Sequence, residues 1–585
     1  MGQLSIDSTP GLWRSPNGDF QLEDGITSNV PTLLGVIGIN FLMLILSFKI
    51  IPIISLFGAF FLISMLAPLI YFILWIFQFA QNANSFLDAG WPLTIFTYLF
   101  SLTVVILLIV NIAMNSWNIL VRFSKLYFRF PRVKAAWAQA DKVSENYQPF
   151  VSIHVPCYSE PPAMVIETLN ALALLDYENY EVIVLDNNTT DINLWKPVEE
   201  HCRKLGKHFR FFHFDRIKGA KAGALNKALT LTAPQAELIA VLDSDYSAKS
   251  DFLKKLVRFF ADPKIGFVQS LQNYRHWENS RYQTACYYEY QDHFELVLPG
   301  QNEWDASYTI GTMCILRRKA MEEVGGWAEW CLTEDSEIAV RIHALGYAGY
   351  YLGNTFGKGL IPLTFEEYKK QHFRWSAGPV QQFQKHWKLY MPWSTSLLTP
   401  IQKIAESFHS LSVFFSQSLN LIMNVIVLGI CLFFSITQGK HFIVPLNLLI
   451  WIPILILHNM ALNIIQIRIL GGNYYNYLGA SLAARSLVFT RILAFYKALF
   501  CKNLAWKRTE KFQTYSNLRR ASLSCWPECI AALIYIVLIA AIAPFGSYLK
   551  PDIICLIMLS FANQAFTYLC APMMALLSEY DLTDP

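Results

Sequence analysis

Charged side chains are scarce in this chain. Only 15% of its 585 residues are Asp, Glu, Lys or Arg, and 54% are hydrophobic, whereas a typical soluble domain has about 25% charged residues. The formal net charge of +4 is small for this length, which argues against a general polyanion binder such as a nucleic-acid-binding protein. A deficit of charge on this scale indicates membrane-spanning segments.

Paired cysteines and an N-terminal export signal are also missing. The eleven cysteines include no CxxC pair, so the sequence shows neither a zinc ribbon nor a redox dithiol. The first thirty residues contain one basic and four acidic residues, which does not match the basic start of a signal peptide. We therefore expect no signal peptide here.

Long apolar runs are abundant. A run of about 18 or more apolar residues can cross a bilayer as a helix, and we predict seven spans of this kind. Lys49 and Pro52 separate the first two, so a single broken hairpin is an alternative there. Core helices of a soluble protein are a further alternative, which the number and length of the runs disfavour. The approximate bounds are 30–48, 51–77, 91–113, 408–434, 442–464, 529–548 and 553–577.

Basic residues predict the orientation of these spans, because they mark the cytoplasmic side. The loop 81–90 has no Lys or Arg, whereas 122–142 and 468–520 are rich in both. The pattern predicts a multi-pass protein of the plasma membrane with its N-terminus outside and its C-terminus inside. Residues 1–121 would hold about three spans, 122–400 a cytosolic domain, and 401–585 interfacial helices, a loop and about four spans.

The cytosolic domain opens with strands that alternate with helices. Four segments have a strand pattern: one begins at Val151, the second ends at Asp186, the third covers 209–214 and the fourth ends near Asp243. Helical patterns lie between them. This alternation predicts an α/β fold with a parallel, doubly wound sheet. Ligands of such sheets bind beyond the carboxyl ends of the strands, where Asp186 and the Asp243–Asp245 triplet lie.

Asp243-Ser244-Asp245 places two carboxylates at one strand end. Buried, unpaired carboxylates cost several kcal/mol each, and Mg²⁺ or Mn²⁺ is a natural partner that also takes phosphate oxygens. The alternative is a solvated turn.

Two further motifs follow the same logic. Lys218 and Lys221 in KGAKAGALNKAL can hold a diphosphate beside a metal, although they also fit a basic helix start, which the helix dipole mildly disfavours. Thr333 precedes Glu334, Asp335 and Glu337. These residues can equally form an N-cap with acidic residues matched to the dipole.

The motifs together resemble those of the processive family-2 glycosyltransferases, such as cellulose, chitin, hyaluronan and curdlan synthases. The similarity covers about residues 151–386, and the segment YTIGTMCILRR from Tyr308, with Gly311 and Thr312, resembles the acceptor-side segment of that family. The matching series is Asp186 in VLDNNTTD, Asp243 and Asp245 as DxD, Thr333–Asp335 as TED, and Gln371, Arg374 and Trp375 as QxxRW.

The resemblance implies a GT-A fold, a nucleotide-sugar donor and a role for each motif. Asp335 would be the general base that deprotonates the acceptor hydroxyl. Donor binding would involve Asp186 on the nucleoside, with Lys221, Asp243 and Arg374 near the diphosphate, while Asp245 together with Asp243 would hold Mg²⁺ or Mn²⁺. The acceptor would contact Thr333, Glu334, Gln371, Trp375, Gly311 and Thr312.

The stretch KKQHFRWSAGPVQQFQKHW, residues 369–387, has two readings. On a helix Gln371, Arg374 and Trp375 share one face, because they lie at i, i+3 and i+4. That face fits an active site, with Trp375 stacked on the acceptor sugar. The other faces carry Lys369, Lys370 and His372, which suit anionic lipid headgroups.

A weaker match lies in the second basic segment. AWKRTEKF, residues 505–512, resembles the FxVTxK gating loop of the same family and retains Thr509 and Lys511. Trp506 replaces the Phe and Arg508 replaces the Val. The amphipathic stretch 487–500 just before it predicts an interfacial helix.

These observations predict a membrane synthase that transfers glucose from UDP-glucose to the end of a growing β-glycan and threads the polymer across the bilayer. A non-processive transferase acting on a lipid and a transporter with a cytosolic regulatory domain are the alternatives. The expected partners are a UDP-sugar, the growing polysaccharide and the lipid bilayer, with no nucleic acid. Accessory subunits, the sugar and the linkage stay open.

Overall fold

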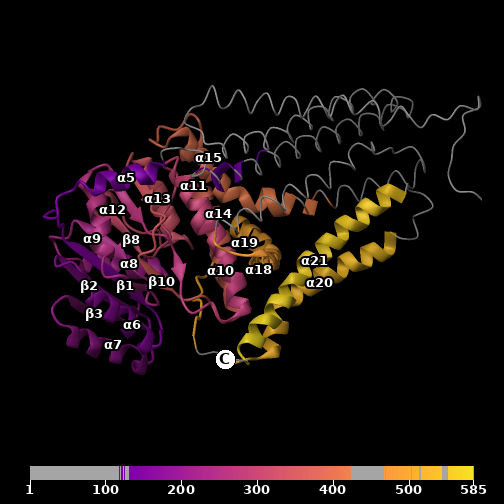
Figure 1. Ribbon diagram of the computed structural model, residues 1–585, viewed down its shortest axis with the longest axis horizontal. Coiled ribbons are helices and arrows are strands. Elements are labelled where there is room, and N and C mark those ends of the chain that lie inside the picture. Colours follow the sequence, from indigo (N-terminus) through magenta and orange to yellow (C-terminus); the bar gives the residue numbers. More distant parts are fainter. Residues whose placement is uncertain are drawn as a thin grey trace, which may run out of the picture. The chain divides into compact units, whose positions relative to one another are not determined.

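The computed structural model describes residues 131–419, 470–501, 504–512, 515–542 and 551–583, with single residues between 113 and 124 and between 421 and 467. All of them belong to one compact unit formed by Ile95–Lys125 and Phe130–Pro585, drawn in colour in Figure 1. The predicted division of the chain at 121 and 400 stays a prediction.

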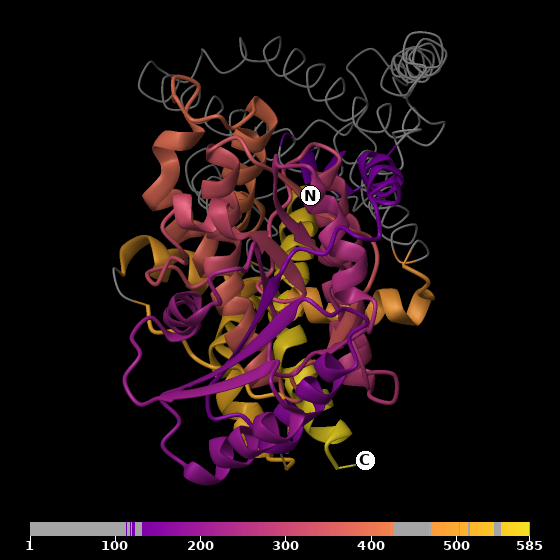
Figure 2. The same ribbon diagram turned by 90° about the vertical axis from the view of Figure 1, so that its left-hand side faces the viewer.

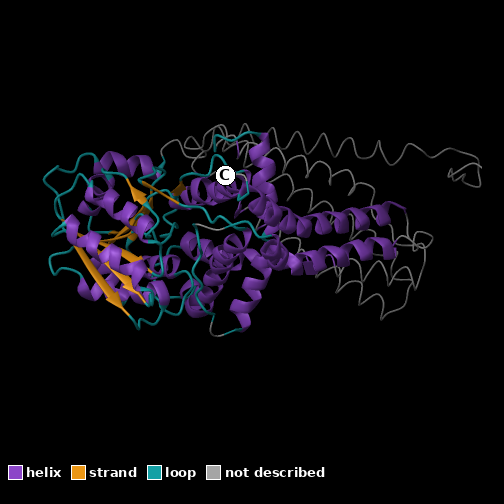
Figure 3. Ribbon diagram, turned by 90° about the horizontal axis from the view of Figure 1, so that it is seen from below, coloured by secondary structure: helices purple, strands orange, loops and turns teal. Residues whose placement is uncertain are grey.

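A seven-stranded sheet forms the centre of the described region. Its strand order is β3-β2-β1-β4-β8-β6-β9, and Figure 3 shows the strands in orange among the surrounding helices. The strands are β1 (Val151–Cys157), β2 (Tyr180–Asn187), β3 (Phe209–Phe214), β4 (Leu238–Val241), β6 (Ile265–Gln269), β8 (Cys314–Arg317) and β9 (Ala348–Tyr351).

The sheet is mixed, so the prediction of a purely parallel sheet is wrong at one strand. β8 runs antiparallel to both of its neighbours, with Val241 of β4 opposite Cys314 and Phe267 of β6 opposite Leu316. The reason is the direction from which the chain enters. β8 begins beside the carboxyl end of β4, where the other strands end, and therefore runs back. The GT-A-like arrangement thus has one reversed strand beside the strand that precedes Asp243.

Helices cover both faces of the sheet. On one face, Ile153 and Val155 of β1 pack with Val165 and Leu169 of α6 (Pro162–Ala173), and α7 (Ile192–Leu205) adds Val198. On the other, Ile183 and Leu185 pack with Ala224 and Ala228 of α8 (Ala220–Leu231). α13 (Glu334–Ala344) covers the same face farther along the sheet. Alternate residues of each strand thus point to opposite faces of the sheet and pack into two separate cores.

The early elements agree closely with the sequence pattern. The β1–α6–β2–α7–β3–α8–β4 order is the predicted one, and β2 contains Asp186. β4 ends at Val241, before Asp243, so the DxD triplet occupies the turn after the strand. Cys157 of β1 pairs with Asp186, and His154 pairs with Val241. The carboxyl ends of these three strands therefore lie next to one another.

The remaining elements frame the sheet. Figure 2 looks from the side of the sheet, with the C-terminal helices behind it. The remaining helices are α5 (Arg132–Ala140), α9 (Phe252–Leu256), α10 (Arg281–Gln291), α11 (Leu298–Asn302), α12 (Arg318–Glu323), α14 (Phe365–Tyr390), α15 (Pro400–Val413), α18 (Tyr474–Ser486), α19 (Val488–Phe500), α20 (Leu518–Ile542) and α21 (Pro551–Asp581). A second, small sheet consists of β5 (Ser247–Ala248), β10 (Gly357–Gly359) and β7 (Asn273–Tyr274).

Two described helical stretches are long and apolar enough to cross a bilayer, by length and composition alone. They are Tyr474–Phe500, which comprises α18 and α19, and Leu518–Ile542, which is α20. The stretch 487–500, predicted as an interfacial helix, lies within the first of them. α20 packs along α21 (Figure 1).

The seven predicted spans are only partly covered. The runs 30–48, 51–77 and 442–464 lie outside the described residues, as does nearly all of 91–113. α15 enters the predicted span 408–434, while α20 and α21 include most of 529–548 and 553–577. The count of seven spans stays a prediction.

The end of α21 is tied to the start of α10. Asp581 Oδ2 accepts hydrogen bonds from Ser280 Oγ (2.5 Å) and from the backbone N–H of Tyr282 (2.8 Å). Ser280 itself caps α10 by accepting from the N–H of Gln283 (2.9 Å). Because the first N–H groups of a helix lack partners within the helix, Asp581 completes the N-terminus of α10.

Candidate active site

A cavity of about 340 Å³ opens at the carboxyl ends of β1, β2 and β4. Its position is the one that parallel α/β sheets use for ligands. Of the predicted site residues, eleven line it, namely Lys221, Asp243, Asp245, Thr333, Glu334, Asp335, Gln371, Arg374, Trp375, Thr509 and Lys511. Asp186, Gly311 and Thr312 are not among its lining residues.

Asp243 is held by residues from two other elements. Lys221 at the start of α8 donates from Nζ to Asp243 Oδ1 (2.5 Å) and to the Gly311 carbonyl (2.8 Å). The N–H of Asp243 donates to Thr312 Oγ1 (3.1 Å). Burial alone would lower the pKa of Lys221, but Asp243, Glu334 and Asp335 together raise it above its ordinary value. The lysine is therefore a fixed cation at the site.

Gly311 and Thr312 were predicted to bind the acceptor; they do not line this cavity, and they contact Lys221 and Asp243. Gly311 has φ +74°, and a Cβ there would stand 2.7 Å from Asp335 Oδ2 and 3.2 Å from Lys221 Nζ. Glycine is thus required both by the left-handed backbone and by the close approach of the two charged groups. The structure gives the pair a supporting position beneath Lys221 and Asp243.

Asp245 is the more buried residue of the DxD pair, with 5% of its surface exposed. Its Oδ2 accepts from the N–H of Leu360 (3.0 Å) and from Lys511 Nζ (2.8 Å). The triplet is therefore no solvated turn, because both carboxylates are engaged by lysines.

Asp243 and Asp245 fit a divalent cation that arrives with its phosphates. Within the described part of the chain, no three His, Cys, Asp or Glu side chains are arranged to hold a metal ion by themselves. Mg²⁺ is commonly bound through one or two carboxylates plus substrate phosphates, which is the donor set that this pair offers. A cation at this position would complete its coordination with phosphate oxygens and water.

The TED segment enters the cavity at the start of α13. Glu334 is buried, and Asp335 lies beside it with its Oδ1 accepting from the N–H of Ser336 (2.8 Å). Burial raises the pKa of both carboxyls, and Lys221 opposes the rise in each case. A carboxylate with a raised pKa is a better proton acceptor, so Asp335 has the electrostatic setting of a general base.

Thr333 precedes α13 but its side chain does not cap the helix, so the N-cap alternative is not realised by its hydroxyl. The hydroxyl instead faces α14, where a Cβ on Gly378 would stand only 2.0 Å from Thr333 Oγ1. The missing side chain at Gly378 lets the two helices approach, and this contact fixes the position of the TED segment.

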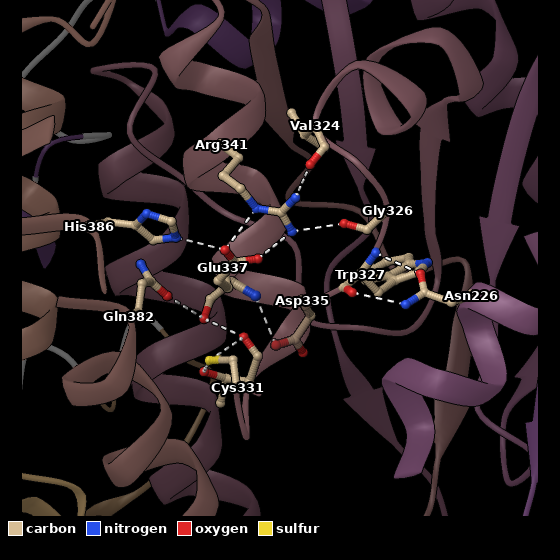
Figure 4. Close-up of polar contacts among 12 residues, drawn as sticks. Asn226, Val324, Gly326, Trp327, Cys331, Asp335, Glu337, Arg341, Gln382 and His386 are labelled. Atoms are coloured by element: carbon tan, nitrogen blue, oxygen red, sulfur yellow. Dashed lines mark hydrogen bonds and ion pairs between the residues drawn. The ribbon is translucent and has the colours of Figure 1, made fainter. Parts of the chain in front are cut away.

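A buried ion-pair network anchors α13 (Figure 4). Arg341 Nε donates to Glu337 Oε1 (2.7 Å), and His386 Nε2 of α14 lies 2.7 Å from the same oxygen. Arg341 also donates to the carbonyls of Val324 and Gly326. Glu337 is fully buried, and removing either partner of such a pair costs about 3–5 kcal/mol. The network therefore holds the helix that carries Asp335 rigidly.

Asp186 lies at the end of β2, beside the cavity. Its Oδ2 accepts from Thr189 Oγ1 (2.8 Å), and its Oδ1 lies 2.8 Å from His213 Nδ1. His213 stacks on Trp195 with the ring centroids 4.3 Å apart. Burial raises the pKa of Asp186, while Thr189 and His213 oppose the rise. The neighbouring Asn187 and Asn188 line the cavity instead.

The QxxRW residues share one face of α14, as predicted. Arg374 Nη2 donates to Thr509 Oγ1 (2.9 Å), and its guanidinium lies 4.9 Å from the ring centre of Trp506. Gln371 Oε1 accepts from Tyr290 OH (2.5 Å), which fixes the orientation of that amide. Thr364 is the N-cap of α14, and its Oγ1 accepts a hydrogen bond from the N–H of Glu367.

Trp375 packs edge-on against aromatic rings and leaves part of its indole at the cavity. The ring centroids of Tyr290 and His372 lie 5.5 Å and 5.1 Å away, at interplanar angles of 64° and 68°. Such edge-to-face contacts are favourable for aromatic pairs, and they fix the plane of the indole.

The other faces of α14 do not match the predicted lipid-binding collar. Lys369 pairs with Glu528 of α20, Lys370 pairs with Glu366 (2.9 Å) and Glu367 (2.6 Å), and the buried His372 lies 3.4 Å from Glu289. Lys369 and His372 are engaged inside the molecule, whereas Lys370 forms its ion pairs along the helix with 33% of its side chain exposed. The sequence pattern could not separate headgroup contacts from internal ion pairs, because the partner carboxylates of Lys369 and His372 lie far away in the chain.

The segment 504–512 lies against the same cavity. Besides Thr509 and Lys511, it contributes Trp506 and Arg508 to the cavity wall. Arg508 Nη1 lies 3.2 Å from Glu160 Oε2. The two residues that depart from the FxVTxK pattern therefore also line the cavity.

A second cavity, of about 660 Å³, adjoins the first. Asp335, Thr333 and Trp375 line both. Its wall includes Tyr308 and His409, whose rings stack with centroids 4.5 Å apart. The two cavities thus meet at the candidate base and at the indole of Trp375.

Three acidic residues that line these cavities, Glu160, Glu289 and Asp292, were not predicted from the sequence. Glu160 follows β1, and burial raises its pKa to about 8 although Arg508 opposes the rise. Its place after a parallel strand was the available signal. Glu289 lies in the wall of the second cavity, where Arg491 Nη2 donates to its Oε1 (2.6 Å) and Tyr368 OH to its Oε2 (2.8 Å). Nothing in the local sequence around Glu289 indicated it.

Known proteins share this domain. Residues 152–325 match the family model described as glycosyl transferase family 2. The chain is 29% identical over 248 residues to a probable glucomannan 4-β-mannosyltransferase 4 of Oryza sativa subsp. japonica, covering 40% of this chain and 44% of that one. It is 30% identical over 253 residues to the UDP-forming cellulose synthase catalytic subunit of Pseudomonas fluorescens (strain SBW25), covering 42% and 33%.

Among solved structures, a mannosyltransferase from Pyrobaculum calidifontis in complex with GDP-Man and Mn²⁺ matches 67% of this chain and 99% of its own, with 17% identity and a TM-score of 0.44. The chain spans about half or less of the length of the two curated relatives. Residues 152–325 form a glycosyl transferase family 2 domain, homologous to cellulose synthase and to glucomannan mannosyltransferases.

Proposed function

We propose that this protein is a nucleotide-sugar-dependent hexosyltransferase that adds hexose units to the end of a growing β-glycan, as processive family-2 glycosyltransferases do. The observation that carries the proposal is the junction of the two cavities at Asp335. A donor in the first cavity and an acceptor in the second would meet at this carboxylate, with Trp375 beside both.

The transfer is a single displacement with inversion. The Asp335 carboxylate takes the proton of the acceptor hydroxyl as that oxygen attacks the anomeric carbon of the donor, and the nucleoside diphosphate leaves. Lys221 and Arg374 line the donor cavity, and they stabilise the negative charge that develops on the diphosphate. A divalent cation held by Asp243 and Asp245 would supply further neutralisation of that leaving group.

The acceptor end of the glycan lies in the second cavity in this proposal. Trp375 forms the platform for the terminal sugar at the junction, because its indole plane is fixed by Tyr290 and His372. The hydrogen bond from Tyr290 to Gln371 keeps the neighbouring amide in one orientation. Thr333 and Glu334 line the first cavity next to Asp335, within reach of the reacting sugars.

Glucose from UDP-glucose is the donor that we propose, with mannose as the second candidate because mannosyltransferases are among the relatives. The direct test supplies the detergent-purified chain with radiolabelled UDP-glucose, GDP-mannose or UDP-N-acetylglucosamine. Linkage-specific glucanases and mannanases then identify the product. Labelled polymer from UDP-glucose that resists mannanase supports the proposal, whereas label found only in free sugar or in lipid contradicts it.

Export of the polymer through the membrane is part of the same proposal. The apolar helices Tyr474–Phe500 and Leu518–Ile542 support membrane association. We propose a multi-pass protein of the plasma membrane with the catalytic domain and the C-terminus in the cytosol. Reporter fusions at the two termini test this orientation, and a C-terminal reporter that is active only outside the cell would overturn it.

A further inference from the structure

Lys511 and Asp245 form an ion pair across 266 residues of sequence. Lys511 Nζ donates to Asp245 Oδ2 over 2.8 Å, and only 14% and 7% of the two side chains are exposed. The same oxygen also accepts from the N–H of Leu360 (3.0 Å). The carboxylate oxygen therefore already has two donors.

Other contacts dock the segment 504–512 on the site. Arg374 donates to Thr509 Oγ1 (2.9 Å), Arg508 pairs with Glu160 (3.2 Å), and the N–H of Glu510 donates to Glu367 Oε2 (2.9 Å). The segment thus bridges the loop after β1 and helix α14, and Lys511 is its contact with the DxD turn.

The two lysines on the DxD pair differ in how they are held. Lys221 lies in α8 and its ammonium also donates to the Gly311 carbonyl, so it is fixed by the fold. Lys511 lies in a segment with neither helix nor strand. Of these two partners, Lys511 is the one that can leave its carboxylate without disturbing a helix.

A divalent cation and Lys511 both draw on the negative charge of the Asp245 carboxylate, and Lys511 already holds it through Oδ2. Mg²⁺ binds carboxylate oxygens at 2.0–2.1 Å with strict octahedral geometry, and an ammonium 2.8 Å from the same oxygen would repel the dication. Resting on the function proposed above, we infer that Lys511 and the divalent cation of the donor complex compete for Asp245. Binding of the cation therefore releases Lys511, and with it the contact between residues 504–512 and the DxD turn.

The exchange leaves the buried carboxylate paired at every stage. Asp245 passes from one cation to another, so that the cost of a buried, unpaired charge is avoided. The cation and the two phosphates of a nucleoside diphosphate sugar bring opposite charges of similar size, so the ligands themselves add little net charge to the cavity.

The first test measures metal affinity without turnover. The full-length protein in detergent is titrated with Mn²⁺ in the presence of UDP, and again with GDP, while electron paramagnetic resonance reports the free ion. Lys511→Met removes the competitor and should lower the Kd for Mn²⁺ at least fivefold. The matched control is Lys507→Met, an exposed lysine of the same segment, which should leave the Kd within twofold of the unaltered protein.

The second test uses the unaltered chain and so does not depend on folding of a variant. An amine-reactive reagent labels accessible lysines, and mass spectrometry follows the labelling rates of Lys511 and Lys507. Addition of Mn²⁺ with the nucleotide should speed labelling of Lys511 several-fold and leave that of Lys507 unchanged.

The results separate this inference from the proposed function. Unchanged or weaker Mn²⁺ binding by Lys511→Met, or protection of Lys511 by Mn²⁺, would overturn the competition even in a preparation that makes polymer. Failure of the unaltered protein to bind Mn²⁺ with either nucleotide would overturn it as well. If the metal-binding and labelling results are as expected but the unaltered protein transfers no sugar, only the proposed function is contradicted.

Discussion

Lys221 lies between Asp243 and the Gly311 carbonyl, donating to both from one ammonium group. This contact joins the start of α8, the turn after β4 and the segment before β8, three parts of the chain that the sheet topology brings to one edge. Because the same lysine also opposes the raised pKa of Asp335, it links the donor side of the site to the candidate base.

Asp335→Asn keeps the shape of the side chain and removes its ability to accept a proton. We expect sugar transfer to fall by roughly 10²–10⁴, while binding of the nucleotide sugar persists because Lys221, Asp243 and Arg374 are untouched. Transfer rates and donor affinity are measured on the same preparation. The matched control is Asp176→Asn, an exposed carboxylate of the same domain, and near-normal transfer by Asp335→Asn would show that another group is the base.

The pH profile should carry the mark of a buried base. Burial raises the pKa of Asp335, and a general base works only in its ionised form, so activity is lost as pH falls through the raised pKa. The acidic limb of kcat/KM should therefore lie above the ordinary aspartate value of about 3.9. Lys221 opposes the rise, so Lys221→Met should move the limb to higher pH in whatever activity it retains; a shift to lower pH would contradict this electrostatic account.

Removal of divalent cations tests the DxD pair as a metal site. EDTA should abolish transfer, and Mg²⁺ or Mn²⁺ should restore it, because two carboxylates and a diphosphate together make up the donor set that such ions need. Asp245→Asn should need more cation for half-maximal rescue than the unaltered protein. Full activity in chelator-treated buffer would rule the site out.

Trp375→Ala separates a sugar platform from a packing residue. If the indole stacks on the terminal sugar, polymer yield should collapse while UDP affinity stays within about threefold, since the stacking of the indole stabilises only the bound acceptor. If Trp375 only packs against Tyr290 and His372, the variant should lose stability, and donor binding should fall in step with it. Polymer of normal length and yield would contradict the platform.

Gly378→Ala tests the approach of α14 to the TED segment. Alanine normally stabilises a helix interior relative to glycine by about 1 kcal/mol, but here its Cβ would meet Thr333 Oγ1 at 2.0 Å. We expect a net destabilisation of about 1–3 kcal/mol from overpacking, measured as a lower apparent Tm. Adding Thr333→Ala should recover part of the loss, and a stabilising effect of Gly378→Ala would refute the close contact.

The sequence predicted the parts of the fold that depend on local pattern. The order of strands and helices from Val151 to Val241 follows from alternating hydrophobic periods, and α14 follows from its helical spacing. β8 was not predicted, and its reversal depends on the path of the chain from the site back into the sheet, which no local pattern shows.

The site was predicted through its motifs, and its contacts were not. Asp243 and Lys221 are 22 residues apart, and the family resemblance placed both near the diphosphate. Lys511 reaches Asp245 from 266 residues away, and Tyr290 reaches Gln371 from 81, distances over which no local pattern carries information. Lys369 and His372 show the converse: basic residues near predicted spans were assigned to lipid, whereas tertiary packing gives them carboxylate partners.

The bond between Asp581 and the start of α10 sets an order of assembly during synthesis. Ser280 and Asp581 are separated by 301 residues, so at 5–20 residues per second a ribosome needs roughly 15–60 s to make the second partner after the first. During that interval the start of α10 lacks the hydrogen bonds to Asp581. α10 also contains Tyr290, which orients Gln371. The Rossmann-like half from β1 to β4 can fold as it emerges, whereas the acceptor wall is completed only when the C-terminal helix has joined it. A nascent chain therefore contains Lys221 and Asp243 of the donor side long before it contains Asp581, which caps the helix of the acceptor wall.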